Sequence, residues 1–535
     1  MKKNYAFLFL LISTVMFSQE EAWVYFNAKP NAQTYLNSPL LMLSQRALDR
    51  RTNQNIALNL SDVPLETTYV SQVKASSGIT IMAQSKWLNA LHIRGTQVNI
   101  NALKAFAFVD KVVFADKSLN LTGKKVLENS SGQTKEKFQA AVNYNYGTSA
   151  NQIQMLNGHI LHQQNYTGSG KIIAVMDAGF PGVNTAQPFQ KLRDNNQILG
   201  GYDFVSRNAN FYTGGSHGTM VLSTMGGYKE NALIGTAPDA SYYLFRTEID
   251  AEENPLEESL WVEAAEKADS LGVDIITTSL GYFADRDNSK YNYTYSDMNG
   301  VTTFISRGAE IAFSKGIIVV ASAGNEGDKS EKHIGGPADA VSVIAVGSVT
   351  SSKVRSSFSS IGPSYDGRIK PDVMARGTAA VVSDTSGNIV TANGTSFSCP
   401  IMAGTIACLW QAYPSKTNQQ IRDMVIQSSD RYLTPDNNYG YGIPNFGATL
   451  DVGSFANNHF KVYPNPARTH VVFSFSNNEA INGTVSIYSV LGQKVLDKTF
   501  TEQNSTVSLE SLKSGLYFYI LDVDGFHKTG KIIKQ

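Results

Sequence analysis

The chain has 535 residues, 45 Lys+Arg against 45 Asp+Glu, and only two cysteines. At roughly 150 residues per domain this length predicts several units, and 42% of apolar residues is enough for globular cores. A net charge of zero gives no electrostatic reason to expect nucleic acid as a partner. Two cysteines exclude a disulfide-dense scaffold and a cysteine-rich metal array.

The amino terminus has the features of an export signal. Lys2 and Lys3 precede an apolar stretch over residues 5–17, and the small residue Ser18 follows. A membrane-spanning helix needs about 20 apolar residues, and this stretch is shorter. We therefore predict a cleaved signal peptide over residues 1–18 and a mature protein outside the cytoplasm, without a membrane span.

Residues 19–146 predict a small α+β unit followed by a linker. A helix is expected from about residue 98, since apolar residues recur at the spacing of one helix face: Ile100, Leu103 and Ala107. A short strand is expected at 111–114. Residues 116–146 are polar, which is typical of an exposed, protease-accessible linker. An ordinary linker without a processing role is the alternative.

Residues 147–455 alternate short apolar β-rich runs with segments of helix length. The runs lie at 172–176, 275–278, 317–320 and 343–346, and the helical segments include 256–271 and 300–314. Continuous apolar runs are typical of strands covered on both faces of a sheet. The alternation predicts an α/β domain with a doubly wound, mostly parallel sheet.

Residues 456–535 contain short β-forming runs separated by turn signals. The runs lie at 471–475, 485–488, 507–509 and 516–520. This spacing predicts a small all-β sandwich. A carbohydrate-binding or adhesion module is one interpretation of such a sandwich.

Three residues with catalytic side chains stand at the ends of predicted elements. Asp177 follows a strand, while His217 and Ser396 each open an apolar helix. Strand ends of a parallel sheet share one edge, and a helix start offers free N–H groups to an oxyanion. Taken singly, each residue is ordinary, as a turn residue, a buried or surface histidine, or a helix cap. Their order along the chain is that of the subtilisin type of catalytic triad.

Around these residues the chain resembles the subtilases, the subtilisin-like serine endopeptidases of the peptidase S8 family. The likeness extends over about 300 residues and includes these segments: 174–179, 217–219, 279–281, 321–327, 370–373, 394–400 and 439–442. The chain departs from the common family pattern at Met220 and at residues 397–399. These departures remove no reacting group and bear on packing and substrate preference.

The resemblance implies an endopeptidase that hydrolyses polypeptides. It assigns the catalytic groups to Asp177, His217, Ser396 and the oxyanion-hole residue Asn325. It assigns substrate binding to Ser279, Leu280, Gly281 and Gly324. No cofactor is needed for this chemistry, and a structural calcium ion stays open without a position. A catalytically silent subtilase that serves as a binding scaffold is the alternative.

The same resemblance assigns roles to the flanking units. Residues 19–146 are similar to a subtilase propeptide, which implies an intramolecular inhibitor removed by cleavage within the linker, at about residues 117–147. Residues 456–535 resemble the sorting domain of type IX secretion, through these segments: 462–466, 490–493, 514–517 and 530–531. That implies the type IX machinery as a partner, in a Gram-negative bacterium. The protein would pass through the periplasm and be secreted or held at the cell surface, where this domain is removed.

Substrate preference is open from the sequence. Residues 323–324 and 335–336 suggest room for a large side chain before the scissile bond, whereas Glu326 would favour a basic one.

Two pairs of residues receive structural interpretations. Cys399 and Cys408 stand in one predicted helix about 13.5 Å apart, beyond the limit of about 7 Å for a disulfide. His159 and His162 could share a helix face, and we interpret them as a solvated pair rather than metal ligands.

Overall fold

The computed structural model describes residues 18–120, 144–249, 251–450, 460–475, 483–490, 492–500, 504–523 and 526–535. Nearly all of the predicted signal peptide and most of the predicted linker lie outside these residues. Within the described part of the chain, no helix combines the length and the apolar character needed to cross a membrane.

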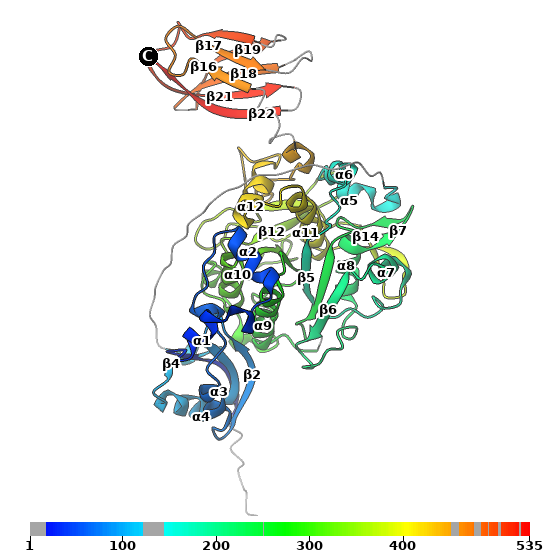
Figure 1. The fold of residues 1–535 in the computed structure, drawn as a ribbon, viewed down its shortest axis with the longest axis vertical. Coiled ribbons are helices and arrows are strands. Elements are labelled where there is room, and N and C mark those ends of the chain that lie inside the picture. The colour runs from blue at the N-terminus through cyan, green and yellow to red at the C-terminus, as the bar shows by residue number, and fades with distance from the viewer. Residues whose placement is uncertain are drawn as a thin grey trace, which may run out of the picture.

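The N-terminal unit is a four-stranded antiparallel sheet with short helices (Figure 1). Its strands, in the order β2-β3-β1-β4, are β1 (Gln19–Phe26), β2 (Ile79–Ser85), β3 (Ala90–Thr96) and β4 (Val109–Phe114). Its helices are α1 (Ala32–Asn37), α2 (Gln45–Asn53), α3 (Thr67–Lys74) and α4 (Gln97–Ala102). The small α+β unit and its strand at 111–114 are confirmed.

The predicted helix that includes Ala107 is shorter than expected. Ile100 and Leu103 are buried, but α4 ends at Ala102 and a single 3-10 turn follows over Leu103–Ala105. Ala107 is exposed beyond this turn, because the chain already turns there to enter β4. Its inclusion in the helix face was wrong.

The central unit is built on a seven-stranded sheet in which every strand pair is parallel. In the order β13-β12-β11-β10-β5-β9-β6, the strands are β13 (Val373–Arg376), β12 (Ile344–Val349), β11 (Ile318–Ser322), β10 (Ile275–Thr278), β5 (Ile172–Asp177), β9 (Ser241–Arg246) and β6 (Ile198–Asp203). The four predicted apolar runs correspond to β5, β10, β11 and β12.

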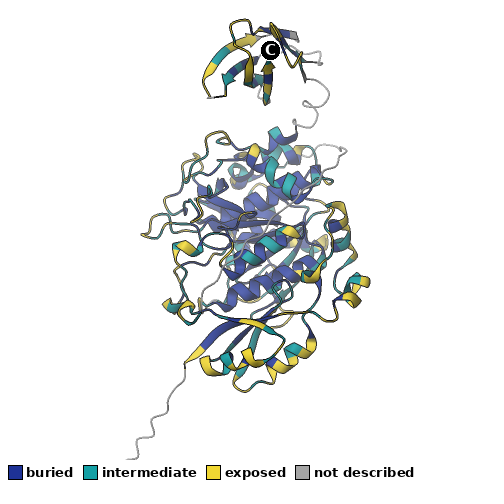
Figure 2. Ribbon diagram, turned by 90° about the vertical axis from the view of Figure 1, so that its left-hand side faces the viewer, coloured by how far each residue is buried: buried dark blue, intermediate teal, exposed yellow. Residues whose placement is uncertain are grey.

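Helices cover both faces of this sheet, which confirms the doubly wound α/β fold (Figures 1 and 2). One face packs against α8 (His217–Gly226), α11 (Thr395–Ala412) and α12 (Asn418–Gln427). The other packs against α9 (Leu256–Leu271) and α10 (Phe304–Ser314). The helix expected from residue 300 begins at Phe304, because the Thr303 side chain caps it by accepting the Ser306 N–H.

Smaller elements lie around this core. They are the helices α5 (Ala150–Gln154), α6 (Gly158–Gln163) and α7 (Gln190–Asp194), and the hairpins of β7 (Tyr228–Lys229) with β8 (Leu233–Ile234) and of β14 (Ala380–Ser383) with β15 (Ile389–Ala392).

The C-terminal unit consists of two antiparallel sheets around a small apolar core, which confirms the all-β prediction. One sheet has the order β16-β17-β20 and the other β19-β18-β21-β22. The strands are β16 (Phe460–Tyr463), β17 (His470–Phe475), β18 (Gly483–Ser489), β19 (Lys494–Phe500), β20 (Asn504–Ser508), β21 (Gly515–Val523) and β22 (Phe526–Lys534).

Candidate functional site

Asp177 ends strand β5 and His217 begins helix α8, and a glycine allows these two elements to meet. A Cβ at Gly218 would lie 2.5 Å from the Gly179 carbonyl oxygen and 2.9 Å from the Asp177 Cβ, so a larger residue would push the helix away. At this close approach His217 Nδ1 lies 2.8 Å from Asp177 Oδ1. Asp177 is buried, whereas 36% of the His217 side chain is exposed. The carboxylate therefore orients an imidazole that solvent or a ligand can reach.

The charge of Asp177 raises the pKa of His217 above its ordinary value, while burial of the ring acts in the opposite direction. The hydrogen bond that His217 donates to Asp177 and the more distant charge of Glu248 add to the increase. The pair is thus arranged to stabilise a protonated imidazole.

Ser396 is the second residue of α11 and lies against the end of β10. Its hydroxyl donates to the Ser279 carbonyl at 3.4 Å, and the Ser279 hydroxyl donates back to the Ser396 carbonyl at 2.8 Å. The ring of Phe397, the next residue, has its centroid 5.9 Å from that of His217. Ser396 and His217 therefore lie on adjoining helix starts, but the hydrogen bonds of the described residues join Ser396 to Ser279 and not to His217.

Asn325 follows strand β11 and is held by the residue before Ser396. Its Oδ1 accepts the backbone N–H of Thr395 at 2.9 Å and the Thr395 hydroxyl at 3.0 Å. This orientation leaves the amide Nδ2 as a donor. A Cβ at Gly394 would lie 3.7 Å from Asn325 Nδ2 and 3.6 Å from the Ser396 backbone nitrogen, so both donors border the same space.

Thr395 is a positioning residue that the sequence analysis did not single out. Besides its two bonds to Asn325, its hydroxyl accepts the backbone N–H of Gly324 at 3.2 Å. Gly324 has a φ of +101°, a backbone conformation that favours glycine. The feature of the sequence that could have identified Thr395 is its position directly before Ser396.

The predicted substrate-binding residues lie on two sides of the β10 end. Ser279, Leu280 and Gly281 line a cavity that also contains Asp177 and His217, while Gly324 lies on the β11 side and is not part of its lining.

This cavity, which we call the acidic pocket, has a volume of about 450 Å³. Six carboxyl side chains line it, and His217 is the only basic side chain in the lining. The lining residues are Asp177, Ala178, His217, Glu248, Ile249, Ala251, Glu252, Glu253, Glu257, Ser279, Leu280, Gly281 and Asp287. The sequence analysis missed Glu248, which stands just beyond the end of β9. Recognition of β9 as a strand would have placed it at the same edge as Asp177.

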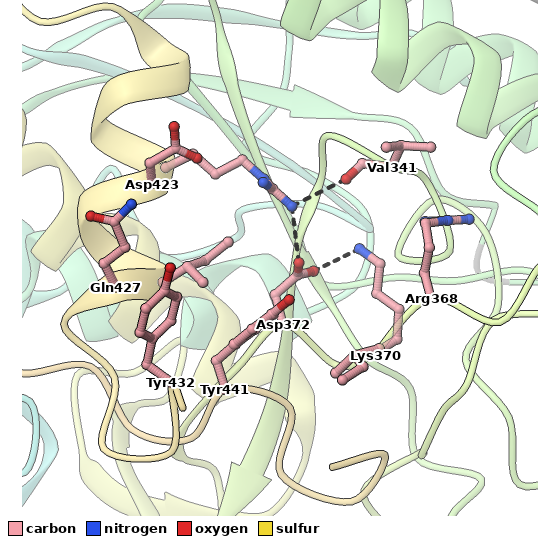
Figure 3. A pocket seen from close by; sticks show the side chains of 11 residues that line it. Val341, Arg368, Lys370, Asp372, Asp423, Gln427, Tyr432 and Tyr441 are labelled. Atoms are coloured by element: carbon pink, nitrogen blue, oxygen red, sulfur yellow. Dashed lines mark hydrogen bonds and ion pairs between the residues drawn. The ribbon is translucent and has the colours of Figure 1, made fainter. Parts of the chain in front are cut away.

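A second cavity, of about 470 Å³, shares no residue with the acidic pocket (Figure 3). Its central carboxylate, Asp372, accepts from Lys370 Nζ at 2.6 Å and from Arg422 Nη2 at 3.0 Å. Its most deeply buried charges are therefore paired with each other, and none of the predicted site residues lies there.

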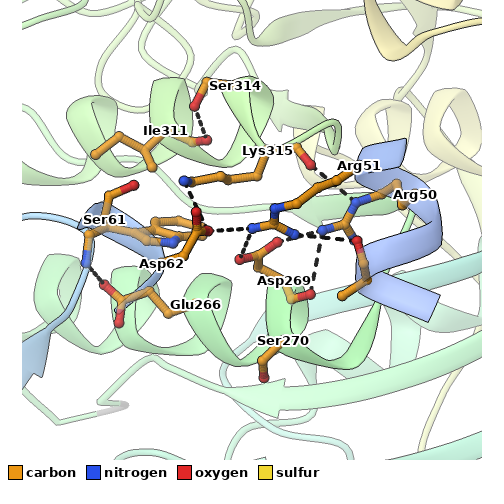
Figure 4. Close-up of polar contacts among 12 residues, drawn as sticks. Arg50, Arg51, Ser61, Asp62, Glu266, Asp269, Ser270, Ile311, Ser314 and Lys315 are labelled. Atoms are coloured by element: carbon orange, nitrogen blue, oxygen red, sulfur yellow. Dashed lines mark hydrogen bonds and ion pairs between the residues drawn. The ribbon is translucent and has the colours of Figure 1, made fainter. Parts of the chain in front are cut away.

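The N-terminal unit contacts the central unit through α9 and α10 (Figure 4). Arg50 and Arg51 on α2 both bind Asp269 on α9, Arg51 Nη2 at 2.9 Å from Asp269 Oδ2. Asp62 binds Arg51 at 2.7 Å and Lys315, which follows α10, at 3.0 Å. All of these side chains are buried, so the interface depends on paired charges in its interior.

A second α9 carboxylate receives the turn between β2 and β3. Glu266 accepts the Ser85 hydroxyl at 2.6 Å and the backbone N–H groups of Lys86 and Trp87 at 3.0 and 2.9 Å. Trp23 Nε1 donates to Ser259 on the same helix at 2.8 Å.

The interpretation of the two histidines as a solvated pair was wrong for His162. This residue is fully buried, with Nδ1 2.7 Å from the Tyr146 hydroxyl and Nε2 3.0 Å from the Thr236 carbonyl. Burial lowers its pKa to about 4. His162 therefore lies in the core because its two ring nitrogens find partners there.

Both cysteines are buried free thiols on α11. Burial raises the pKa of Cys399 to about 12. Among the described residues, no group of three or more His, Cys, Asp or Glu side chains is placed to hold a metal ion.

A parallel sheet with an Asp–His pair and a serine at its strand ends, beside an oriented amide donor, is the arrangement of an α/β serine hydrolase. Residues 168–442 match the model of the subtilase family, peptidase S8. The chain belongs to this family and is a serine endopeptidase.

The flanking units match family models as well. Residues 21–135 match the peptidase S8 propeptide domain of Bacteroidota, and residues 461–535 match a secretion system C-terminal sorting domain. The sorting domain implies a secreted or cell-surface protein of the Bacteroidota.

Curated relatives support the same family. Subtilisin NAT of Bacillus subtilis subsp. natto is 34% identical over 301 residues, which is 55% of this chain and 70% of the relative. Subtilisin of Bacillus pumilus is 33% identical over 301 residues, which is 55% of this chain and 96% of the relative. The crystal structure of the epidermin leader peptide processing serine protease of Staphylococcus aureus aligns with a TM-score of 0.53 at 17% identity. That alignment covers 81% of this chain and 98% of the other, and it shows the shared fold.

Proposed function

We propose that the chain is the precursor of a secreted endopeptidase that works through Asp177, His217 and Ser396. The observation that carries the proposal is the 2.8 Å hydrogen bond between Asp177 and His217, directly beside the helix start that holds Ser396. His217 Nε2 takes the proton of the Ser396 hydroxyl as its oxygen attacks the peptide carbonyl. Asp177 keeps the ring oriented and stabilises the imidazolium. Catalytic hydrogen bonds are often formed only once substrate is bound, which accounts for the present Ser396–Ser279 contact.

The negative charge that forms on the carbonyl oxygen is stabilised by Asn325 Nδ2 and the Ser396 backbone N–H. Both donors border the space beside Gly394. The protonated His217 then gives its proton to the departing amine, and the acyl group stays on Ser396. Water then attacks the acyl group as His217 takes its proton. The new carboxyl end leaves, and His217 returns the proton to the Ser396 oxygen. Loss of one such donor in a subtilisin costs about 10²–10³ in turnover, and the same order is expected for Asn325→Ala.

The N-terminal unit is proposed to act as an intramolecular inhibitor. Its support is the buried ionic contact with α9 and α10, which ties the unit to the catalytic domain. Activation would require cleavage in the linker at about residues 117–147. The C-terminal unit would take the protein through the periplasm to the type IX machinery and be removed at the cell surface.

The test compares Ser396→Ala with Ser398→Ala, a serine two residues further along the same helix. Ser398 donates to the Thr395 carbonyl and has no role in the proposed reaction. We expect Ser396→Ala to abolish casein cleavage and labelling by a fluorophosphonate, and Ser398→Ala to keep both. Labelling that persists in Ser396→Ala would contradict the assignment. An unmodified enzyme that cleaves nothing once the propeptide is removed would favour the silent scaffold.

A further inference from the structure

The acidic pocket is part of the candidate reaction centre. Its walls come from the ends of three neighbouring strands: Asp177 at β5, Glu248 beyond β9, and the segment 279–281 beyond β10. Asp177 and His217 also line this pocket. A substrate side chain bound in it would therefore lie close to the proposed catalytic residues.

The negative charge of this pocket is not neutralised by its own lining. The six carboxyl side chains face no Lys or Arg within that lining. Arg286, the neighbouring cation, is buried and outside the lining. It is bound to Glu258 and to the Asn254 carbonyl, and its Nη1 lies 3.8 Å from Oε2 of the lining residue Glu257. Asp177 is 2% exposed, and its Oδ2 has no hydrogen-bond partner among the described residues. A cationic group that enters the pocket would therefore be attracted by carboxyl groups that no Lys or Arg of the lining neutralises.

The pKa shifts of these groups agree with carboxyls that are buried and close to one another. Burial raises the pKa of Glu248 to about 8, and the nearby Glu253 and Asp177 add to the increase. Burial likewise raises the pKa of Glu257 to about 10, together with the charges of Glu248 and Glu253. A cationic ligand would reverse this effect by favouring the charged carboxylates.

Glu248 and Glu252 are placed to contact a ligand, whereas Glu257 is not. Glu257 is fully buried, and its oxygens accept the backbone N–H groups of Ile249 and Asn254. Glu248 is partly exposed, with Oε1 held by the Tyr282 hydroxyl at 2.7 Å, and Glu252 is exposed at the rim. Glu248 thus provides a fixed carboxyl inside the pocket and Glu252 an adaptable one at its edge.

The order of the strands in the sheet determines which substrate side chain would enter the acidic pocket. Gly324 follows β11 on one side of β10, and the acidic pocket lies on the β5 and β9 side. In an extended peptide paired with residues 279–281, successive side chains point to opposite sides. If the residue before the scissile bond faces Gly324, the second and fourth residues before that bond face the acidic pocket.

We propose that the acidic pocket selects polypeptides with Lys or Arg at the second or fourth position before the scissile bond, through Glu248 and Glu252. This inference rests on the proposed function and specifies its substrate class. Each contact would be a charge-assisted hydrogen bond, which is enough for a preference of about tenfold or more.

The experiment uses the full chain after activation and pairs of fluorogenic peptides. Within each pair the sequences are identical except for Lys or norleucine at the second or the fourth position. We expect kcat/KM to be at least about tenfold higher for Lys at one of these positions. In Glu248→Gln or Glu252→Gln the Lys-to-norleucine ratio should fall towards one. Because Glu252 is exposed, its variant tests the proposal without risk to folding.

The matched control is Glu230→Gln, an exposed residue beyond β7 that should leave the ratio unchanged. Two results would overturn the proposal while leaving the proposed function intact: Ser396-dependent cleavage without a basic preference, or a preference retained in both glutamine variants. Absence of Ser396-dependent cleavage of any peptide would overturn the proposed function, and this inference with it.

Discussion

Helix α9 presents carboxylates at both ends, and the two ends differ in what neutralises them. Burial alone would raise the pKa of Asp269, near the C-terminal end, but Arg50 and Arg51 bring it below its ordinary value. At the N-terminal end burial raises the pKa of Glu257 to about 10, and the charges of Glu248 and Glu253 in the acidic pocket add to the increase. The first end is paired with cations of the N-terminal unit. At the second end Arg286 is bound to Glu258 and its Nη1 lies 3.8 Å from Glu257 Oε2, while Glu257 also lines the acidic pocket.

This difference separates two uses of buried charge. Paired charges in a dry interface make removal of one partner costly, so they specify which segment docks there. Carboxyl groups in a cavity whose lining has no Lys or Arg instead attract cationic side chains of a polypeptide that enters from solution. Substitutions at the two ends of α9 should therefore have different effects on stability.

The largest effect is expected from Asp269→Asn. Removal of this carboxylate leaves Arg50 and Arg51 buried with less compensation, which should destabilise the precursor by about 3–5 kcal/mol. Urea denaturation of the uncleaved Ser396→Ala precursor measures this, followed by tryptophan fluorescence, because Trp23 and Trp87 are buried against α9. The control is Arg46→Gln, which breaks a pair with Asp274 in which 41% of the arginine side chain is exposed. Its cost should stay below about 1 kcal/mol, and equal losses in both variants would contradict the division.

The next effect depends on pH and concerns Glu266. Burial beneath the β2–β3 turn raises its pKa from 4.5 to about 7. Its contribution to the free energy of unfolding is therefore greatest below pH 4.5. That contribution falls as the pH rises to about 7, by up to about 3 kcal/mol. Glu266→Gln should remove this part of the pH dependence, whereas Glu230→Gln should keep it. The same denaturation measured from pH 4 to pH 8 checks this, and identical profiles for Glu266→Gln and the parent precursor would contradict it.

The smallest effect, and one of opposite sign, is expected from Glu248→Gln. Because the pKa of Glu248 is about 8, the parent protein loses stability as the pH rises from 4.5 towards 8, and the variant does not. At pH 8 we expect the variant to be more stable by roughly 1 kcal/mol, a value reduced for partial exposure of the side chain. A clear loss of stability in thermal unfolding would show that the carboxylate is structural, as Asp269 is.

Much of the fold was predictable because the central strands are buried on both faces. The runs at 172–176 and 275–278 coincide with β5 and β10 to within one residue, and 256–271 is α9. Strands β6 and β9 were missed because their apolar pattern is interrupted by Gly200 and Gly201 in one and flanked by Ser241 and Arg246 in the other. The local apolar runs that identified central strands contain no glycine and no charged residue.

The sequence by itself determined the family and led to the proposed set of reacting residues, because motifs around Asp177, His217 and Ser396 occur in the chain order of that family. Tertiary structure alone decided how Asn325 is held by Thr395 and which charges find partners. Asp177, Glu248 and Asp287 lie far apart along the chain. They line one pocket because the sheet order β10-β5-β9 differs from the chain order and brings the carboxyl ends of these strands together.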